Sequence, residues 1–214
     1  MTAKAGVVVT SIVLVCAAFT FSGCIVVATN PWLADTSATT NTVIAGGWVD
    51  TNKEAFATFE NVPGQEGRYR LALQEDSPKE AKTWRYECSL HLLENTLLLQ
   101  TGPDDKAEIS PGAAVPAFML FKAILNGDRM DLLRMDPEKA KASALKSKLI
   151  LVAGDPEKNG NPKEEGVVIG SWTTDLETFV RKNLKEEEFF DPEPVYSFTR
   201  VAATNAPAAA PASR

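Results

Sequence analysis

Hydrophobic and polar residues alternate along much of the chain, which is typical of β-strands that bury one face. The clearest example runs from residue 84 to residue 92, where apolar side chains alternate with charged or polar ones. Turn-forming residues separate such segments, and Asn126-Gly127 between two of them predicts a tight hairpin. The pattern predicts strands over 43–49, 55–62, 68–74, 84–92, 96–100, 117–125, 128–135, 167–172 and 195–201, and a weaker one over 149–152.

Two segments late in the chain carry helix signals instead. The first, 137–146, follows Asp136 as a capping residue and has proline at its first helical position. The second, 175–187, follows Thr174-x-x-Glu177, which predicts a capping box. At helical spacing, its apolar face is expected to comprise Leu176, Phe179, Val180 and Leu184.

Many short antiparallel strands in one domain favour a sandwich or a closed barrel. Gly46-Gly47-Trp48 at the start of the first predicted strand, with Arg200 in the last, resembles the Gly-x-Trp signature of lipocalin-like barrels. In that family the tryptophan closes the barrel floor, and a basic residue of the final strand packs over its indole. The resemblance concerns Gly46, Trp48 and Arg200. It implies a mainly β fold, a small antiparallel lipocalin-like β-barrel with one or two short helices late in the chain.

The first 23 residues resemble the signal peptide of a bacterial lipoprotein. Lys4 supplies a positive charge, residues 5–21 are uncharged and mostly apolar, and Phe21-Ser22-Gly23-Cys24 resembles a lipobox. In that family the cysteine thiol receives a diacylglyceryl group, so the resemblance implies that Cys24 is lipidated and anchors the chain to a membrane. The alternatives are an uncleaved anchor helix and an ordinary secretory signal followed by a chance cysteine.

Composition divides the rest of the chain. Residues 24–42 lack regular periodicity and are expected to form the lipidated cysteine and a tether, 43–201 the barrel domain, and 202–214 a disordered tail rich in Ala and Pro. Over nearly its whole length, the order of features resembles a loose group of uncharacterised bacterial lipoproteins without an assigned activity. That resemblance implies a lipid-anchored protein of the cell envelope. Ile25 after the cysteine favours the periplasmic side of the outer membrane in a Gram-negative host.

Charge and cysteine content narrow the expected partners. The formal net charge is −6, and removal of residues 1–23 takes away Lys4 and leaves −7. An acidic surface argues against nonspecific binding of nucleic acid. The expected partner is a membrane, which the chain would reach through its lipid anchor.

Cys16 leaves with the signal peptide and Cys24 carries the anchor, so Cys88 has no partner for an internal disulfide.

No motif predicts a catalytic residue, a metal site or a cofactor. His91, the single histidine, falls on the polar phase of its strand and is expected to be solvated. Cys88 falls on the apolar phase and is expected to pack in the core as a small hydrophobe. The run 155–161 resembles the start of a calcium-binding loop, but Lys163 and Gly166 stand where further ligands are needed.

The barrel interior remains as the candidate site. The residues expected to line it are Trp84, Tyr86, Phe118, Leu120 and Met130. A barrel of this size holds one apolar ligand or is filled by its own side chains. We therefore expect a non-catalytic binding or scaffolding module whose partner is a small apolar ligand or another envelope protein. The alternatives are an envelope hydrolase that uses carboxylates and a purely structural lipoprotein.

Overall fold

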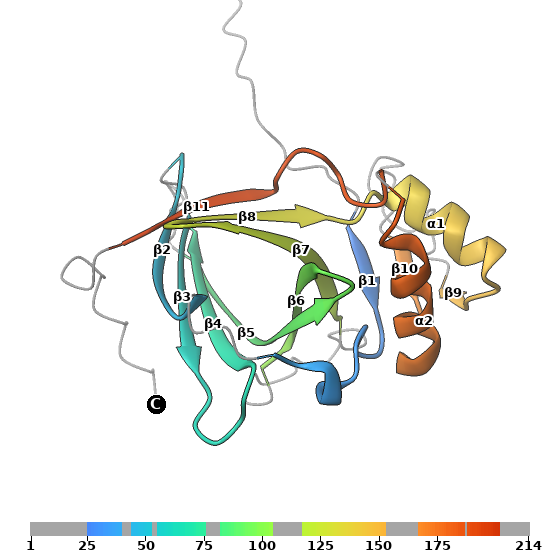
Figure 1. Cartoon of the computed structure of the whole chain (residues 1–214), viewed down its shortest axis with the longest axis horizontal. Coiled ribbons are helices and arrows are strands. Elements are labelled where there is room, and N and C mark those ends of the chain that lie inside the picture. Colours follow the sequence, from blue (N-terminus) through green and yellow to red (C-terminus); the bar gives the residue numbers. More distant parts are fainter. Residues whose placement is uncertain are drawn as a thin grey trace, which may run out of the picture.

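A closed β-barrel forms the centre of the molecule (Figure 1). The computed structural model describes residues 25–39, 44–52, 55–75, 82–104, 117–152, 167–186 and 188–201. Within these ranges, eight antiparallel strands close the barrel in the order β11-β2-β3-β4-β5-β6-β7-β8. This arrangement confirms the predicted fold class. The barrel strands are β2 (Gly46–Asp50), β3 (Ala55–Asn61), β4 (Arg68–Glu75), β5 (Lys82–Leu93), β6 (Thr96–Pro103), β7 (Met119–Asn126), β8 (Arg129–Arg134) and β11 (Tyr196–Arg200).

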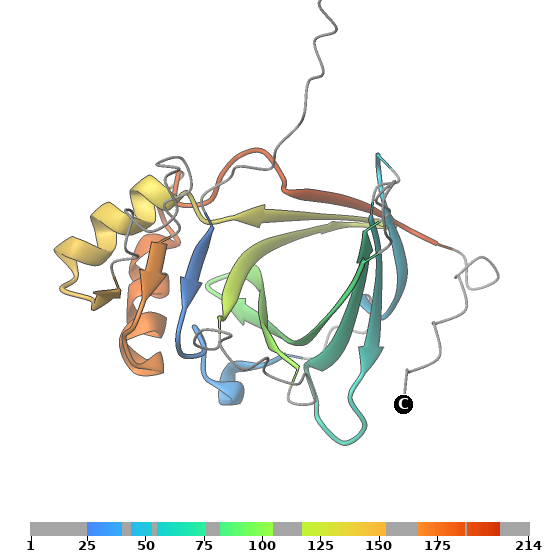
Figure 2. The same ribbon diagram turned by 180° about the vertical axis from the view of Figure 1, so that it is seen from behind.

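A small sheet and two helices lie on one side of the barrel, as the two opposite views show (Figures 1 and 2). Strand β1 (Val26–Ala28) pairs in parallel with β10 (Val167–Ile169), which pairs antiparallel with β9 (Leu151–Val152). Helices α1 (Pro137–Lys146) and α2 (Thr173–Asn183) lie beside this sheet.

The barrel wall separates two hydrophobic clusters, an inner cluster and an outer cluster. Successive residues of a strand point to opposite faces of the sheet, so β6 and β7 contribute to both. Leu99 and Phe121 belong to the inner cluster, whereas Leu98 and Leu120 belong to the outer cluster together with residues of α1, α2 and β1. This part of the wall is therefore apolar on both faces.

The strand predictions hold best where a strong turn separates two strands. The predicted hairpin between β7 and β8 is present, but Asn126 pairs with Arg129, so the turn residues are Gly127 and Asp128, one position later than predicted. Gly127 has a φ of 58°, a conformation that favours glycine. The strand predicted over 167–172 ends at residue 169, because the following residues lead into α2.

The predicted side-chain cap is present at the start of α1 and absent at the start of α2. The Asp136 carboxylate accepts a 2.8 Å hydrogen bond from the Lys139 backbone N–H, which confirms the cap of α1. Helix α2 begins after Trp172 without a side-chain cap, so the predicted capping box is wrong. Glu177 lies within the helix, and its carboxylate accepts a 2.7 Å hydrogen bond from Arg181 instead. The buried apolar residues of α2 include Leu176, Phe179 and Val180, as predicted.

The predicted tether is wrong over residues 25–39, which we call the N-terminal strap. The strap contains β1 and a short 3₁₀ helix, η1 (Asp35–Ser37), and it buries Trp32 and Leu33 completely. The Trp32 indole N–H donates a 2.9 Å hydrogen bond to the Phe118 backbone carbonyl beside β7. The partners of the strap lie far along the chain, which is why its own sequence shows no periodicity.

Some sequence predictions concern residues outside the described ranges. These are the signal peptide over 1–23, the anchor at Cys24, the loop over 155–166 and the tail over 202–214. In the part of the chain that is described, no helix is long and apolar enough to cross a membrane.

Candidate functional site

The residues of the Gly-x-Trp signature meet at one end of the barrel. The guanidinium carbon of Arg200 lies 4.3 Å from the ring centre of Trp48, which is completely buried. Arg200 donates a 2.8 Å hydrogen bond to the Ala45 carbonyl, and the Trp48 indole N–H donates one of 2.8 Å to the Ile44 carbonyl. Gly46 has a φ of +116°, and a Cβ there would lie 3.2 Å from the Arg200 guanidinium. These contacts join the first and last strands of the barrel, β2 and β11, through a cation–π interaction.

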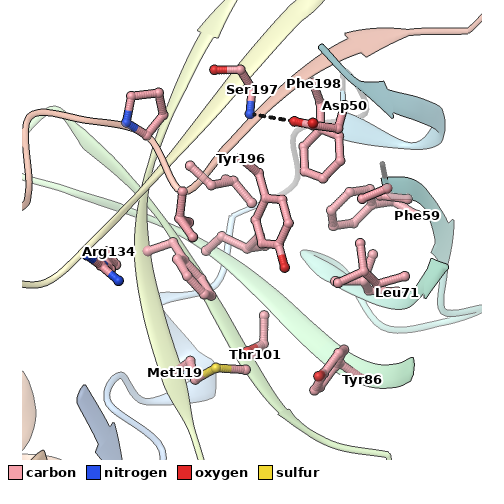
Figure 3. Close-up of a pocket in the computed structure, with 18 of the residues that line it drawn as sticks. Asp50, Phe59, Leu71, Tyr86, Thr101, Met119, Arg134, Tyr196, Ser197 and Phe198 are labelled. Atoms are coloured by element: carbon pink, nitrogen blue, oxygen red, sulfur yellow. Dashed lines mark hydrogen bonds between the residues drawn. The ribbon is translucent and has the colours of Figure 1, made fainter. Parts of the chain in front are cut away.

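The barrel also contains a cavity of about 940 Å³ (Figure 3). Tyr196 extends into it, with its ring stacked on that of Phe198 at a centroid distance of 5.3 Å. Other inner residues, including Tyr69, Leu90 and Met130, are buried without lining the cavity. The interior is therefore filled in one part and hollow in another. The apolar lining includes Ala55, Ala57, Phe59, Leu71, Leu73, Leu99, Met119, Phe121, Leu132, Val195 and Phe198.

A few polar side chains interrupt this apolar lining. Thr101 is 2% exposed, and within the described ranges its Oγ1 is the one buried side-chain nitrogen or oxygen without a hydrogen-bond partner. Arg134 lines the cavity and pairs with Asp191 at 3.5 Å. Asp50 accepts hydrogen bonds from two backbone N–H groups at 3.1 and 3.2 Å. Arg129 also lines the cavity and pairs with Asp131 at 3.0 Å. The cavity thus combines a large apolar surface with one unpaired hydroxyl and two guanidinium groups.

The five residues predicted to line the interior lie in different parts of the structure. Tyr86 lines the cavity. Met130 is buried in the inner cluster without lining the cavity, and Trp84 is 46% exposed. Phe118 and Leu120 pack with the outer cluster, so the prediction that they face the interior is wrong.

The error on β7 is a shift of one residue in the alternation, which exchanges the two faces of a strand. Met119 pairs with Thr101 and Phe121 pairs with Leu99, and all four residues line the cavity. Strand β7 is apolar on both faces, so hydrophobicity alone does not assign its inner face. The charged Lys122 marks the outward phase of this strand and is the signal that could have found the inward one.

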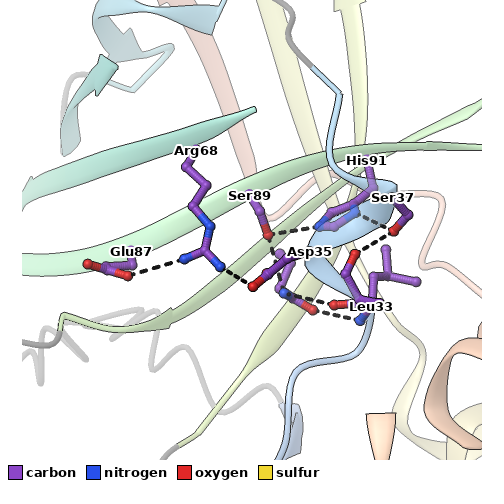
Figure 4. A network of polar contacts seen from close by, with 9 residues as sticks. Leu33, Asp35, Ser37, Arg68, Glu87, Ser89 and His91 are labelled. Carbon is purple, nitrogen blue, oxygen red and sulfur yellow. Dashed lines mark hydrogen bonds and ion pairs between the residues drawn. The ribbon is translucent and has the colours of Figure 1, made fainter. Parts of the chain in front are cut away.

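A buried polar seam joins the strap to the outer wall of the barrel (Figure 4). It consists of Gln100, Ser89, His91 and Ser37. The Gln100 Oε1 accepts a 2.8 Å hydrogen bond from the Leu33 backbone N–H, and its Nε2 donates one of 3.2 Å to Ser89 Oγ. Ser89 Oγ lies 2.8 Å from His91 Nε2, and His91 Nδ1 lies 2.9 Å from Ser37 Oγ. This chain of contacts fastens the strap to β5 and β6.

His91 is completely buried under the strap, so the prediction that it is solvated is wrong. The Ser37 hydroxyl donates to the Ala34 carbonyl at 2.7 Å, and we therefore assign the His91 Nδ1–H as donor to Ser37. The Nε2 then accepts from Ser89, which describes a neutral imidazole. Burial is the main cause of a lowered pKa for His91 and favours the same neutral form. His91 therefore holds the strap in place and does not line the cavity.

Cys88 lies buried in the inner cluster, as predicted. Burial, with a further contribution from the charge of Glu87, raises the pKa of its thiol far above the ordinary value. The thiol therefore remains protonated and is a poor nucleophile. Within the described ranges, no group of three or more His, Cys, Asp or Glu side chains is placed to hold a metal ion.

The architecture and the site together define a class of protein. The domain is a closed eight-stranded antiparallel barrel with a cavity, consistent with a lipocalin-like barrel. Comparison of the chain with protein-family models, curated proteins and solved structures found no match.

Proposed function

We propose that the chain is a non-catalytic binding module of the cell envelope, held to a membrane by a lipid on Cys24, whose barrel takes one small apolar ligand. The observation that carries this proposal is the cavity of about 940 Å³ and its mainly apolar lining. Small-molecule sites typically occupy roughly 300–1,000 Å³ and are lined by apolar and aromatic side chains. Transfer of apolar ligand surface from water into such a site is favourable by about 25 cal/mol per Å².

The packing of the rest of the barrel favours a ligand site and argues against a loosely packed core. Protein interiors are close-packed, with few voids larger than a water molecule. The part of the barrel around Trp48 follows this rule, because Trp48, Tyr69, Leu90 and Met130 are all nearly inaccessible to solvent. The cavity thus occupies one part of a barrel whose other part is filled by buried side chains.

The placement of the two most reactive side chains favours binding over hydrolysis. His91 lies outside the barrel wall beneath the strap, and Cys88 is packed in the inner cluster. Neither residue lines the cavity. A hydrolase would need a nucleophile or a general base within reach of the bound molecule. The carboxylate of the lining, that of Asp50, is engaged by two backbone N–H groups.

The described part of the N-terminal strap begins at the cavity wall. Ile25, which follows Cys24 in sequence, is 42% exposed and contributes to the cavity wall. A lipid on Cys24 would hold this side of the cavity toward the membrane, where apolar molecules are concentrated.

A hydrocarbon probe tests the ligand site. We expect diphenylhexatriene, which fluoresces in apolar surroundings, to bind the purified mature chain at about one molecule per barrel. Ala57→Phe places a ring at the cavity lining and should weaken binding about tenfold, whereas Ala72→Phe, one strand away and outside the lining, should not. Circular dichroism verifies that both variants fold. Absence of binding to the wild type, or equal binding to both variants, contradicts the proposal.

The variant Cys24→Ser tests the anchor separately. We expect the wild-type chain to remain with the membrane after a high-salt wash and the variant to appear in the soluble fraction. A variant that still sediments with the membrane would show that a lipid on Cys24 does not hold the chain.

A further inference from the structure

One hydroxyl in the cavity wall has no partner within the protein. Thr101 Oγ1 is buried, although buried hydroxyl groups are ordinarily hydrogen-bonded. The cross-strand neighbours of Thr101 are Cys88 on β5 and Met119 on β7. Both carry sulfur, which is a weak hydrogen-bond partner. The wall at this position is therefore suited to a polar group that comes from a bound molecule.

A positive charge lies two strands away from this hydroxyl, on the same inner face of the barrel wall. Phe121 follows Met119 on the inner face of β7 and pairs with Arg134 on β8. Among the described residues, the Arg134 side chain donates a 3.5 Å hydrogen bond to Asp191, and a guanidinium has five N–H donors. Asp50, the acidic residue of the cavity lining, is already engaged by two backbone N–H groups. Arg134 thus retains donors for an anionic group.

We infer that the cavity takes a single-chain amphiphile with an anionic end, such as a long-chain carboxylate. The apolar chain lies against Phe59, Leu71 and the other apolar lining residues. An oxygen of its polar end accepts a hydrogen bond from Thr101, and the negative charge lies toward Arg134. Rotation about one side-chain bond turns the Thr101 hydroxyl without any change in the backbone. The inference rests on the proposed function and adds a polar end to the apolar ligand.

Palmitate and diphenylhexatriene, titrated in parallel, test this inference. Thr101→Val keeps the shape of the side chain and removes its hydroxyl, and Thr101→Ser keeps the hydroxyl. Thr199→Val is the matched control, because Thr199 is exposed on β11. We expect Thr101→Val to weaken palmitate binding about tenfold and to leave diphenylhexatriene binding unchanged. Thr101→Ser and Thr199→Val should bind both molecules as the wild type does.

The charge is tested with Arg134→Gln and a neutral ligand of the same chain length, monopalmitoylglycerol. We expect the variant to lose about tenfold in affinity for palmitate and to bind monopalmitoylglycerol unchanged.

The outcomes separate the two proposals. If the wild type binds neither probe, the proposed function fails and the inference fails with it. If the wild type binds diphenylhexatriene but Thr101→Val and Thr101→Ser both bind palmitate as tightly as the wild type, the hydroxyl contacts no ligand and only the inference is overturned. If Arg134→Gln weakens palmitate and monopalmitoylglycerol equally, the anionic end is refuted.

Discussion

Replacement of Gln100 by methionine should loosen the N-terminal strap while leaving the barrel closed. The buried Gln100 side chain accepts a 2.8 Å hydrogen bond from the Leu33 N–H and donates one of 3.2 Å to Ser89. Methionine has nearly the same length but no amide group. Leaving the Leu33 N–H buried without an acceptor costs about 1–3 kcal/mol, and the lost bond to Ser89 adds about 0.5–1.5 kcal/mol. The free energy of unfolding should therefore fall by about 1.5–4.5 kcal/mol.

Urea denaturation measures this loss, with Gln74→Met as the matched control. Gln74 is exposed on β4, so its replacement should change the free energy of unfolding by less than about 0.5 kcal/mol. Hydrogen exchange localises the effect. The amides of Leu33 and of Thr39, which donates to the Leu90 carbonyl at 2.7 Å, should exchange faster in Gln100→Met. Equal stability of the two variants, with unchanged exchange at both amides, would refute the view that the seam holds the strap.

Three further changes test other parts of the structure. Gly102→Ala would place a Cβ 2.6 Å from the Phe118 ring, and this overpacking should cost about 1–3 kcal/mol in thermal denaturation; an unchanged melting temperature would contradict it. Burial lowers the pKa of His91 from its ordinary value of 6.5, so as the pH falls below that value the unfolded chain takes up a proton that the folded chain does not. Wild-type stability should therefore fall more steeply below pH 6.5 than that of His91→Gln, and parallel slopes in urea titrations would count against this. Arg200→Met removes the contact over Trp48 and should lower the free energy of unfolding by about 1–2 kcal/mol, which a urea titration would detect or disprove.

The features that the sequence predicts correctly depend on short segments of the chain. Alternation identified the barrel strands, because each strand buries one face against the interior. The cap at Asp136 is formed by residues only three positions apart. The contact between Arg200 and Trp48 is long-range, and it was predicted through the resemblance to a known signature and not through local pattern.

The wrong assignments of barrel residues to the inside, the outside or solvent share one cause, which is the second layer outside the barrel. The strap covers the polar phase of β5, so His91 is buried although its position in the alternation suggests solvent. The outer cluster makes the outward residues of β7 apolar, so Phe118 and Leu120 resemble interior residues. The partners that create this layer lie far apart in sequence. Neither periodicity nor turn chemistry encodes their distance in space.

The pairing of β1 with β10 also has a consequence for how the chain folds. The Asn30 side chain donates a hydrogen bond to the Ser171 carbonyl, which lies 141 positions later. Contacts of such long sequence separation form slowly, and β10 is synthesised long after β1. Until β10 arrives, the apolar residues of β1 and Trp32 lack their final cover, and exposed apolar surface in a partly folded chain promotes association. The segment of this fold that is made first is thus among the last to reach its final place.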